Sequence, residues 1–171
     1  MGWAGAVTVG LALVVALAGL PLYVFPPQEA PSKSDVIFVI GPADRWRLDW
    51  AEGLIQEGLS DNLMISVGDP SWAPECTEDR GFRILCRRSD PFTTQGEARW
   101  LRDEMRENGW TTATVITMTP HVSRTRVRMD RCVPTGVNVI GRADGLSPTD
   151  WAWQYLYQTA GFVKVVLQPT C

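Results

Sequence analysis

Short apolar runs alternate with amphipathic segments along most of the chain. The apolar runs are continuous and rich in β-branched residues, which is typical of strands buried on both faces. The expected strands are 36–40, 63–67, 113–118 and 137–140. Segments with apolar positions near helical spacing follow them, over 45–57, 93–108, 121–131 and 151–159. This alternation predicts an α/β fold, a three-layer Rossmann-like domain whose mostly parallel sheet is covered by helices on both faces.

Two segments are less determined by their sequence. The stretch from Ser71 to Asp90 is expected to be irregular, and a connection of that length is usually functional or cross-linked. Phe162 to Leu167 fits either a last edge strand or the end of a helix.

Thr93 or Thr94 followed by Glu97 has the spacing of a capping box, so local helix capping alone explains these side chains.

The N-terminal stretch from Trp3 to Phe25 contains no charged residue. It is long enough to cross a hydrocarbon core of roughly 30 Å, which predicts one transmembrane helix within residues 1–25. A cleaved signal peptide is the alternative, since Ala16-Leu17-Ala18 resembles a cleavage site. We favour the anchor because the apolar run continues beyond that site. Residues 26–34 form a proline-rich linker, expected to be extended and unpacked, and residues 35–171 form the α/β domain.

The four cysteines indicate an oxidising compartment. None is arranged as Cys-x-x-Cys and the single histidine is not close to any of them in sequence, so no metal site is predicted. An even number of cysteines after an export-type segment favours disulfides. Of three possible pairings we favour Cys76–Cys86 and Cys132–Cys171, with free buried thiols as the alternative. The domain is therefore expected on the extracytoplasmic side of the cell membrane.

Charge and motifs exclude several function classes. The net charge is -3 with a pI near 5.2, so no basic field indicates nucleic-acid binding. Gly-x-Ser-x-Gly, Gly-x-x-x-x-Gly-Lys and Gly-x-Gly-x-x-Gly are all absent from the sequence. This argues against oxidoreductases and nucleoside triphosphatases, and the sequence indicates no particular cofactor.

His121, the only histidine, follows a predicted buried strand and begins a helix. Ligands of parallel α/β sheets bind beyond the carboxyl ends of the strands, and a helix N-terminus with Arg124 beside it suits an anion. The alternative is a structural histidine bonded to a loop carbonyl. Four arginines are spread over more than one face of this helix: Arg124, Arg126, Arg128 and Arg131. They are expected to be solvated, with contact to an anionic lipid or polymer as the alternative.

These features together resemble the YdcF/SanA/ElyC-like family, over residues 35 to about 131. The resemblance rests on four segments that occur in the family's order. They are an Arg–Ala–Leu–Gly spacing at Arg47, Ala51, Leu54 and Gly58, the strand end Ser66-Val67-Gly68-Asp69, the segment 90–98, and Thr117 to Arg124 with its His-x-x-Arg. The family's glycine-rich turns are reduced here to Gly41-Pro42-Ala43 and Gly68-Asp69, which is expected to narrow or alter the site.

The resemblance implies a membrane-anchored protein of cell-envelope homeostasis. Its crevice would bind an anionic, phosphorylated or lipid-linked envelope precursor. If the protein is an enzyme, it would also process this precursor. The ligand-binding candidates are Gly41, Arg47, Gly68, Asp69, Thr94, Thr119 and Arg124. His121 is the candidate for proton transfer, since its ordinary pKa lies near neutrality, and Glu97 is its candidate partner. For Arg47 a solvated helix position and for Asp69 a plain Asp-Pro turn are the competing interpretations. The alternative functions are a module binding S-adenosylmethionine or a nucleotide without turnover, and a non-catalytic partner of a membrane complex whose proteins the sequence does not name.

Overall fold

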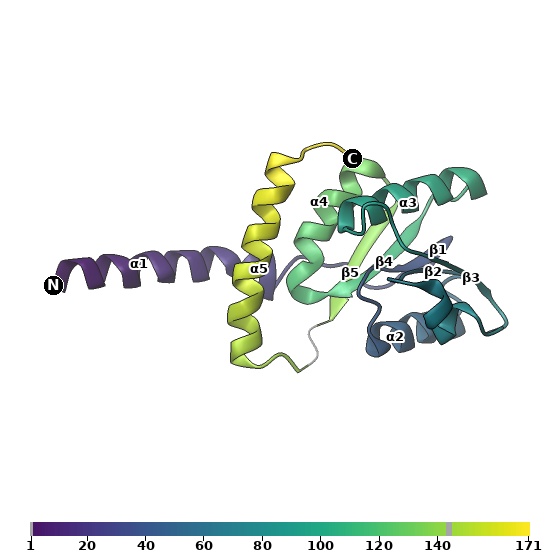
Figure 1. The fold of residues 1–171 in the computed structure, drawn as a ribbon, viewed down its shortest axis with the longest axis horizontal. Helices are drawn as coiled ribbons and strands as arrows, with labels where there is room; N and C mark the ends of the chain where they lie inside the picture. The colour runs from purple at the N-terminus through teal and green to yellow at the C-terminus, as the bar shows by residue number, and fades with distance from the viewer. Residues whose placement is uncertain (1, 143–144) are drawn as a thin grey trace.

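The structure is a computed structural model that describes residues 2–142 and 145–171. Within these residues five strands form one parallel sheet in the order β3-β2-β1-β4-β5 (Figure 1). The strands are β1 (Val36–Val39), β2 (Asn62–Ser66), β3 (Arg83–Arg87), β4 (Ala113–Met118) and β5 (Val137–Arg142). The predicted α/β class and Rossmann-like parallel sheet are confirmed. This order reverses direction between β1 and β4, which is the place where such sheets bind ligands.

Helices cover both faces of the sheet. The α-helices after the first strand are α2 (Arg45–Gln56), α3 (Thr94–Asn108), α4 (Val122–Cys132) and α5 (Pro148–Leu167). Short 3₁₀ turns are η2 (Pro70–Trp72), η3 (Pro74–Cys76) and η4 (Thr119–His121). Alternate residues of β1 point to opposite sides: Phe38 packs with Trp100 of α3 and Met129 of α4, whereas Ile37 packs with Leu54 of α2. A strand that is buried on both faces does not alternate between polar and apolar residues, which explains the continuous apolar runs in the sequence.

Strand β3 lies inside the stretch that was expected to be irregular, so that expectation was wrong. Arg83 and Arg87 at its two ends are exposed, and the three residues between them are only partly buried. It pairs with β2 at the edge of the sheet, from Asn62 opposite Arg83 to Ser66 opposite Arg87. An edge strand with charged ends lacks the apolar run that identifies a central strand.

Helix α5 is one continuous helix, and Phe162 to Leu167 belong to its end rather than to an edge strand. Its start is fixed by a capping box in which Ser147 and Asp150 each accept a hydrogen bond from the other's backbone N–H. The helix packs against α4 and η4. It therefore covers the carboxyl edge of the sheet beyond α4 rather than adding a strand to the sheet.

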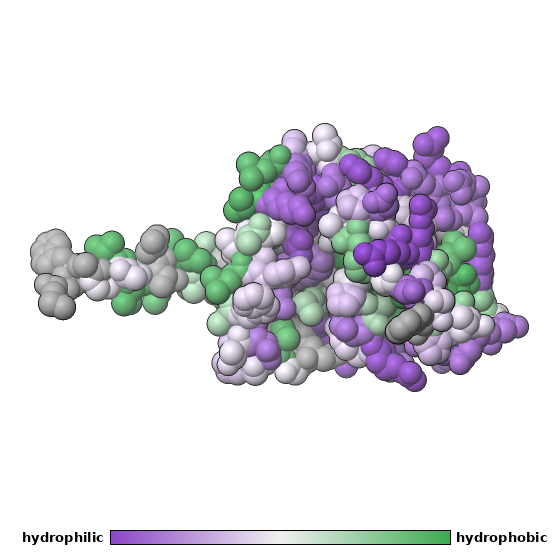
Figure 2. Space-filling view, in the orientation of Figure 1, coloured by the Kyte–Doolittle hydropathy of each residue, from purple (hydrophilic) through white to green (hydrophobic). Residues whose placement is uncertain are grey.

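The N-terminal segment forms α1 (Gly2–Gly19), continued by the π-helical turn η1 (Leu20–Val24). It projects away from the domain, with mostly apolar surface where its side chains are described (Figures 1 and 2). Gly5–Val24 is 20 residues long and its most apolar window has a mean hydropathy of 2.3, so by length and composition it can cross a membrane. The following linker is extended but, against expectation, not unpacked, because Ala30 O accepts from Asn138 of β5 and Gln28 Oε1 accepts from the Gly141 N–H.

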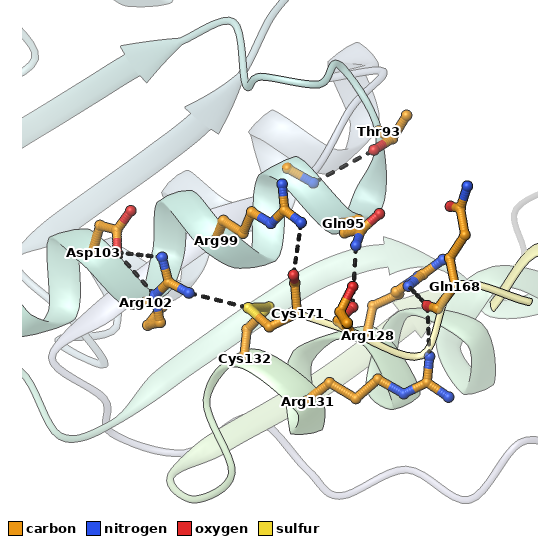
Figure 3. The surroundings of a disulfide bond; sticks show 12 residues. Thr93, Gln95, Arg99, Arg102, Asp103, Arg128, Arg131, Cys132, Gln168 and Cys171 are labelled. Carbon is orange, nitrogen blue, oxygen red and sulfur yellow. Dashed lines mark hydrogen bonds and ion pairs between the residues drawn. A yellow bond between two sulfur atoms is a disulfide. The ribbon is translucent and has the colours of Figure 1, made fainter. Parts of the chain in front are cut away.

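All four cysteines form the two favoured disulfides, Cys76–Cys86 and Cys132–Cys171. The second joins the end of α4 to the end of the chain, which runs between α3 and α4 (Figure 3). Arg99 and Arg102 of α3 also reach Cys171, donating to its carbonyl oxygen at 2.7 Å and to its Sγ at 3.2 Å. The cross-link and these donors hold the tail that follows α5.

Candidate functional site

A cavity of about 500 Å³ lies beyond the carboxyl ends of β1 and β4, between α3, α4 and α5. Gly41 and Pro42 line it after β1, and His121 lines it after β4. The other lining residues are Phe92, Thr93, Thr94, Gln95 and Glu97 from α3 and the loop before it, Arg124 and Arg128 from α4, and Tyr157, Ala160, Gly161, Lys164 and Val165 from α5. The cavity therefore opens at the crossover point that the strand order predicts for a ligand.

Glu97 is a buried carboxyl at the base of this cavity. Its Oε1 accepts the N–H of Gly41 at 2.7 Å, which ties the first turn of α3 to the end of β1. The Thr93 hydroxyl accepts the Gly96 N–H and caps α3, as expected, but Glu97 takes no part in this cap, so the capping-box interpretation of Glu97 was wrong. Burial raises the pKa of Glu97, while the Ser66 hydroxyl, the Gly41 N–H and two nearby arginines oppose that rise.

His121 is buried between two threonine hydroxyls. Its Nδ1 lies 3.0 Å from Thr117 Oγ1 and its Nε2 lies 3.4 Å from Thr94 Oγ1. Burial, reinforced by the cations of Arg124 and Arg47, lowers the pKa of His121 well below its ordinary value. The ring is therefore neutral at pH 7, with one nitrogen donating and the other accepting. In this state it connects the end of β4 to the first turn of α3.

Arg124 reaches the cavity through a close contact with α5. Its Nε donates to Gln158 Oε1 at 2.9 Å, and its guanidinium carbon lies 5.5 Å from the centre of the Tyr157 ring. A Cβ added to Gly161 would lie 2.7 Å from Arg124 Cδ, so the absence of a side chain at Gly161 lets Arg124 cross α5 here. Burial lowers the pKa of Arg124 from a very high ordinary value, so the group stays a cation.

The other arginines of α4 are not on a solvated face, contrary to expectation. Arg128 donates to the Gln168 carbonyl at 2.7 Å, and Arg131 donates to the Val165 carbonyl at 2.7 Å. Arg126 donates to the Pro27 carbonyl of the linker. The last carbonyls of a helix have no partner within it. Arginines from α4 therefore donate hydrogen bonds to these carbonyls of α5, and their positive charge is also favourable at the negative end of the helix dipole.

The charges around the cavity favour an anion. Arg124, Arg128 and Lys164 line it, against the single carboxyl of Glu97, whose pKa is raised. The N-termini of α3 and α4 also meet there, at Thr94 and at His121. Helix N-termini present free N–H groups and a partial positive charge, so phosphate or carboxylate oxygens fit this surface.

The structure brings together five of the nine predicted catalytic and ligand-binding residues in the lining: Gly41, Thr94, Glu97, His121 and Arg124. Arg47 is buried below it, donating to the Ile40 carbonyl at 3.1 Å and pairing with Asp44, so it is not a solvated helix residue. Thr119 is buried in η4 and does not line the cavity. Gly68 and Asp69 are exposed and outside it, and the Asp69 carboxylate accepts the Ser71 N–H in a local turn.

The part of the cavity lining that comes from α5 was not predicted from the sequence, above all Tyr157, Gly161 and Lys164. A signal for the full helix was present, since Ser147-Pro148-Thr149-Asp150 is a capping-box sequence with proline in the first turn. Nothing in the sequence indicates that this helix folds back over α4.

No family model matches the chain, and no curated protein or solved structure matches it. The resemblance to the YdcF/SanA/ElyC-like family therefore stays a prediction. Roles for the residues of the cavity rest on their own geometry.

Proposed function

We propose that the chain is a membrane-anchored protein of the cell envelope whose cavity binds an anionic, phosphorylated or lipid-linked ligand. The observation that carries the proposal is the placement of the three cations Arg124, Arg128 and Lys164, with two helix N-termini, around a cavity at the crossover point of the sheet. A neutral ligand would leave these cations without a counter-charge. Phosphate oxygens would pair with them and with the free N–H groups of the helices.

The anchor and its side of the membrane are part of this proposal. The apolar segment Gly5–Val24 is long enough to span a bilayer, and it leaves the domain without being covered by it, since 12% of its most apolar window is buried. Two disulfides favour an oxidising compartment, which corresponds to the extracytoplasmic side. The family resemblance, with anchored members outside the cytoplasmic membrane, points the same way.

His121 and Glu97 have defined roles in the proposal. The buried carboxyl holds Gly41 and the loop after β1 in place through its hydrogen bond. The neutral imidazole positions Thr94, whose hydroxyl lines the cavity. If the ligand is turned over, a phosphate group beside His121 would raise the pKa of that ring and make it a proton acceptor, with Glu97 as the neighbouring acid.

The test is thermal unfolding of the full chain in detergent micelles, with its disulfides oxidised, against a panel of ligands. The panel holds polyprenyl-phosphate analogues, cell-wall glycan fragments, nucleotides and S-adenosylmethionine. A ligand at 100 times its dissociation constant adds about 2.7 kcal/mol to the free energy of unfolding. We expect phosphorylated lipid analogues to raise the unfolding temperature and S-adenosylmethionine to leave it unchanged.

Two arginine variants make the test specific. R124Q removes a cation from the cavity lining, and R106Q removes one from the exposed last turn of α3. We expect R106Q to keep the ligand-induced shift and R124Q to lose most of it, with the ligand-free unfolding temperature recorded for each. A shift with nucleotides alone would replace the proposal with a nucleotide-binding module. The absence of any shift in folded protein would favour a non-catalytic partner of a membrane complex.

A further inference from the structure

Helix α5 has an outward face that is almost entirely apolar. Trp153, Leu156, Val163 and Leu167 are 62%, 69%, 55% and 75% exposed, respectively. Their spacing of three, seven and four residues places them on one side of the helix. Asp150 and Lys164 are the charged residues of α5, and Asp150 belongs to its first turn. Soluble monomers seldom expose so many large apolar side chains together, so this face indicates a contact.

The face lies beside the root of the apolar helix α1. The Tyr155 hydroxyl donates to the Ala16 carbonyl at 3.1 Å, and the hydroxyls of Tyr23 and Thr159 lie 3.0 Å apart. Gly19 contacts the Tyr155 ring so closely that a Cβ there would overlap it. Helix α5 runs across the axis of α1 rather than along it, at the side of the domain from which α1 projects (Figure 1). Apolar surface covers parts of both helices on that side (Figure 2).

The contacts with α1 also indicate the depth at which α5 lies relative to the proposed membrane span. Tyr23 is one position before Val24, at the end of the span nearest the domain, and its hydroxyl lies 3.0 Å from that of Thr159 on α5. If Gly5–Val24 spans the hydrocarbon core, α5 therefore meets the span at its end, and the Tyr155 side chain reaches from there toward the middle of the span, to Ala16. A helix crossing α1 at this level lies at the boundary between lipid headgroups and acyl chains.

We propose that α5 lies in the plane of the bilayer, with Trp153, Leu156, Val163 and Leu167 in the headgroup–acyl boundary. Helices that lie in this boundary carry Trp, Phe and Leu on one face and insert that face by about 5–10 Å. Trp and Tyr are enriched at this depth, which suits Trp153 and the half-exposed Tyr157. Lipid is favoured over a protein partner because the anchor proposed for α1 places a bilayer at this level.

The placement also narrows the ligand class, in a step that rests on the proposed function. Tyr157, Ala160 and Lys164 line the cavity and are exposed on α5. The mouth of the cavity therefore borders the proposed lipid surface. An anionic headgroup of a membrane-resident lipid reaches Lys164 and Arg124 from the side while its chains stay in the bilayer.

The experiment uses the full chain in nanodiscs that hold one copy each, which prevents a second copy from covering α5. An environment-sensitive nitrobenzoxadiazole label is attached to L156C, and to E107C at the exposed end of α3 as the matched control. The disc lipids are phosphatidylethanolamine and phosphatidylglycerol, with or without bromine on the upper acyl chain. We expect brominated lipid to quench the L156C label at least twofold more than the E107C label, with blue-shifted emission for L156C alone.

Equal quenching of the two labels would overturn the proposal. An L156C label that is blue-shifted but not quenched would overturn it as well, because protein rather than lipid would then cover the face. The experiments can disprove the bilayer contact of α5 and the binding of an anionic ligand independently of each other. If K164Q loses ligand binding while the L156C label is still quenched, both the role of Lys164 in the cavity and the bilayer contact of α5 are supported. Phosphorylated lipid binding without quenching would leave the proposed function standing while removing the bilayer contact.

Discussion

The Nε of Arg124 donates to the Oε1 of Gln158 at 2.9 Å, and Gln158 is 1% exposed. This bond joins α4, which follows the central strand β4, to α5, whose outer face is apolar. The amide nitrogen of Gln158 in turn donates to Gln154, so the acceptor is held in one orientation. A side chain at the cavity is thus positioned by the helix that we place at the membrane surface.

The contact between Arg124 and α5 predicts that two glycine-to-alanine substitutions within helices will differ in their effect on ligand affinity. A Cβ at Gly161 displaces the Arg124 side chain, whose Nε would lie 2.8 Å from it, but a flexible side chain moves at small cost. G161A is therefore expected to keep its unfolding temperature within a few degrees of wild type and to weaken ligand binding about tenfold or more. The measurement is a binding isotherm beside a thermal unfolding curve.

The matched control is G53A in α2, where an added Cβ meets nothing within 4 Å. Alanine is favoured over glycine in a helix by about 1 kcal/mol, so G53A is expected to stabilise the protein without changing its affinity. If G161A binds as tightly as G53A, Arg124 does not contact the ligand.

The single histidine makes the titration of His121 directly observable. One imidazole Hε1 resonance is expected in a proton NMR spectrum of the full chain in detergent, purified without a histidine tag. Because burial and two neighbouring cations lower the pKa of His121, the midpoint is expected well below 6.5. A bound phosphorylated ligand adds negative charge and should move the midpoint upward. A midpoint at or above 6.5 without ligand would contradict the buried environment described for this ring.

The two buried titratable groups oppose each other in the pH dependence of stability. The unfolded chain protonates His121 below pH 6.5 while the folded chain resists, so this group lowers the free energy of unfolding as the pH falls. The unfolded chain ionises Glu97 above pH 4.5 while the folded chain resists, so this group lowers it as the pH rises. Each slope is at most about 1.4 kcal/mol per pH unit.

E97Q removes one of these slopes. Between pH 4.5 and 6.5 we expect the free energy of unfolding of E97Q to fall more steeply on acidification than that of wild type, as measured by urea unfolding in mild detergent. E107Q removes one negative charge from the exposed end of the same helix and controls for the change in net charge. Parallel profiles for E97Q and wild type would refute a buried carboxyl that resists ionisation.

The two disulfides are expected to contribute unequally. Their sequence separations of 39 and 10 residues correspond, in the chain-entropy description, to about 4 kcal/mol for Cys132–Cys171 and about 2.7 kcal/mol for Cys76–Cys86. The paired substitution C132S/C171S should therefore lower the free energy of unfolding more than C76S/C86S. It should also release the tail held by Arg99 and Arg102, which hydrogen exchange would detect as faster exchange at the end of α5. Equal losses would count against this role for the tail.

The central layer of this fold was predictable because its signals are local. The strands β1 and β4 are rich in β-branched residues and buried at almost every position, and Thr93 and Gly109 mark the ends of α3. The edge strand β3 was missed because its ends are arginines, and half-buried positions carry little apolar signal. Periodicity detects burial, and an edge strand has less of it.

The site was predictable at the strand ends and not at α5. His121, Glu97 and Gly41 lie near one another because parallel strands end at one edge, which follows from the order of elements along the chain. The orientation of Arg128 follows from carbonyls that α5 leaves unsatisfied after folding back over α4. That contact depends on tertiary packing, so neither charge nor spacing in α4 could distinguish it from a solvated arginine.

The most direct test of the anion-binding cavity uses the two lysines of the chain, Lys164 at the cavity and Lys33 in the exposed linker. We would measure the dissociation constant of a short-chain polyprenyl phosphate for the full chain in detergent, comparing wild type, K164Q and K33Q at two salt concentrations. The account predicts wild-type affinity for K33Q, about tenfold weaker binding for K164Q, and a smaller salt dependence for K164Q. Equal affinities for the two variants, or no binding to the wild type, would contradict it.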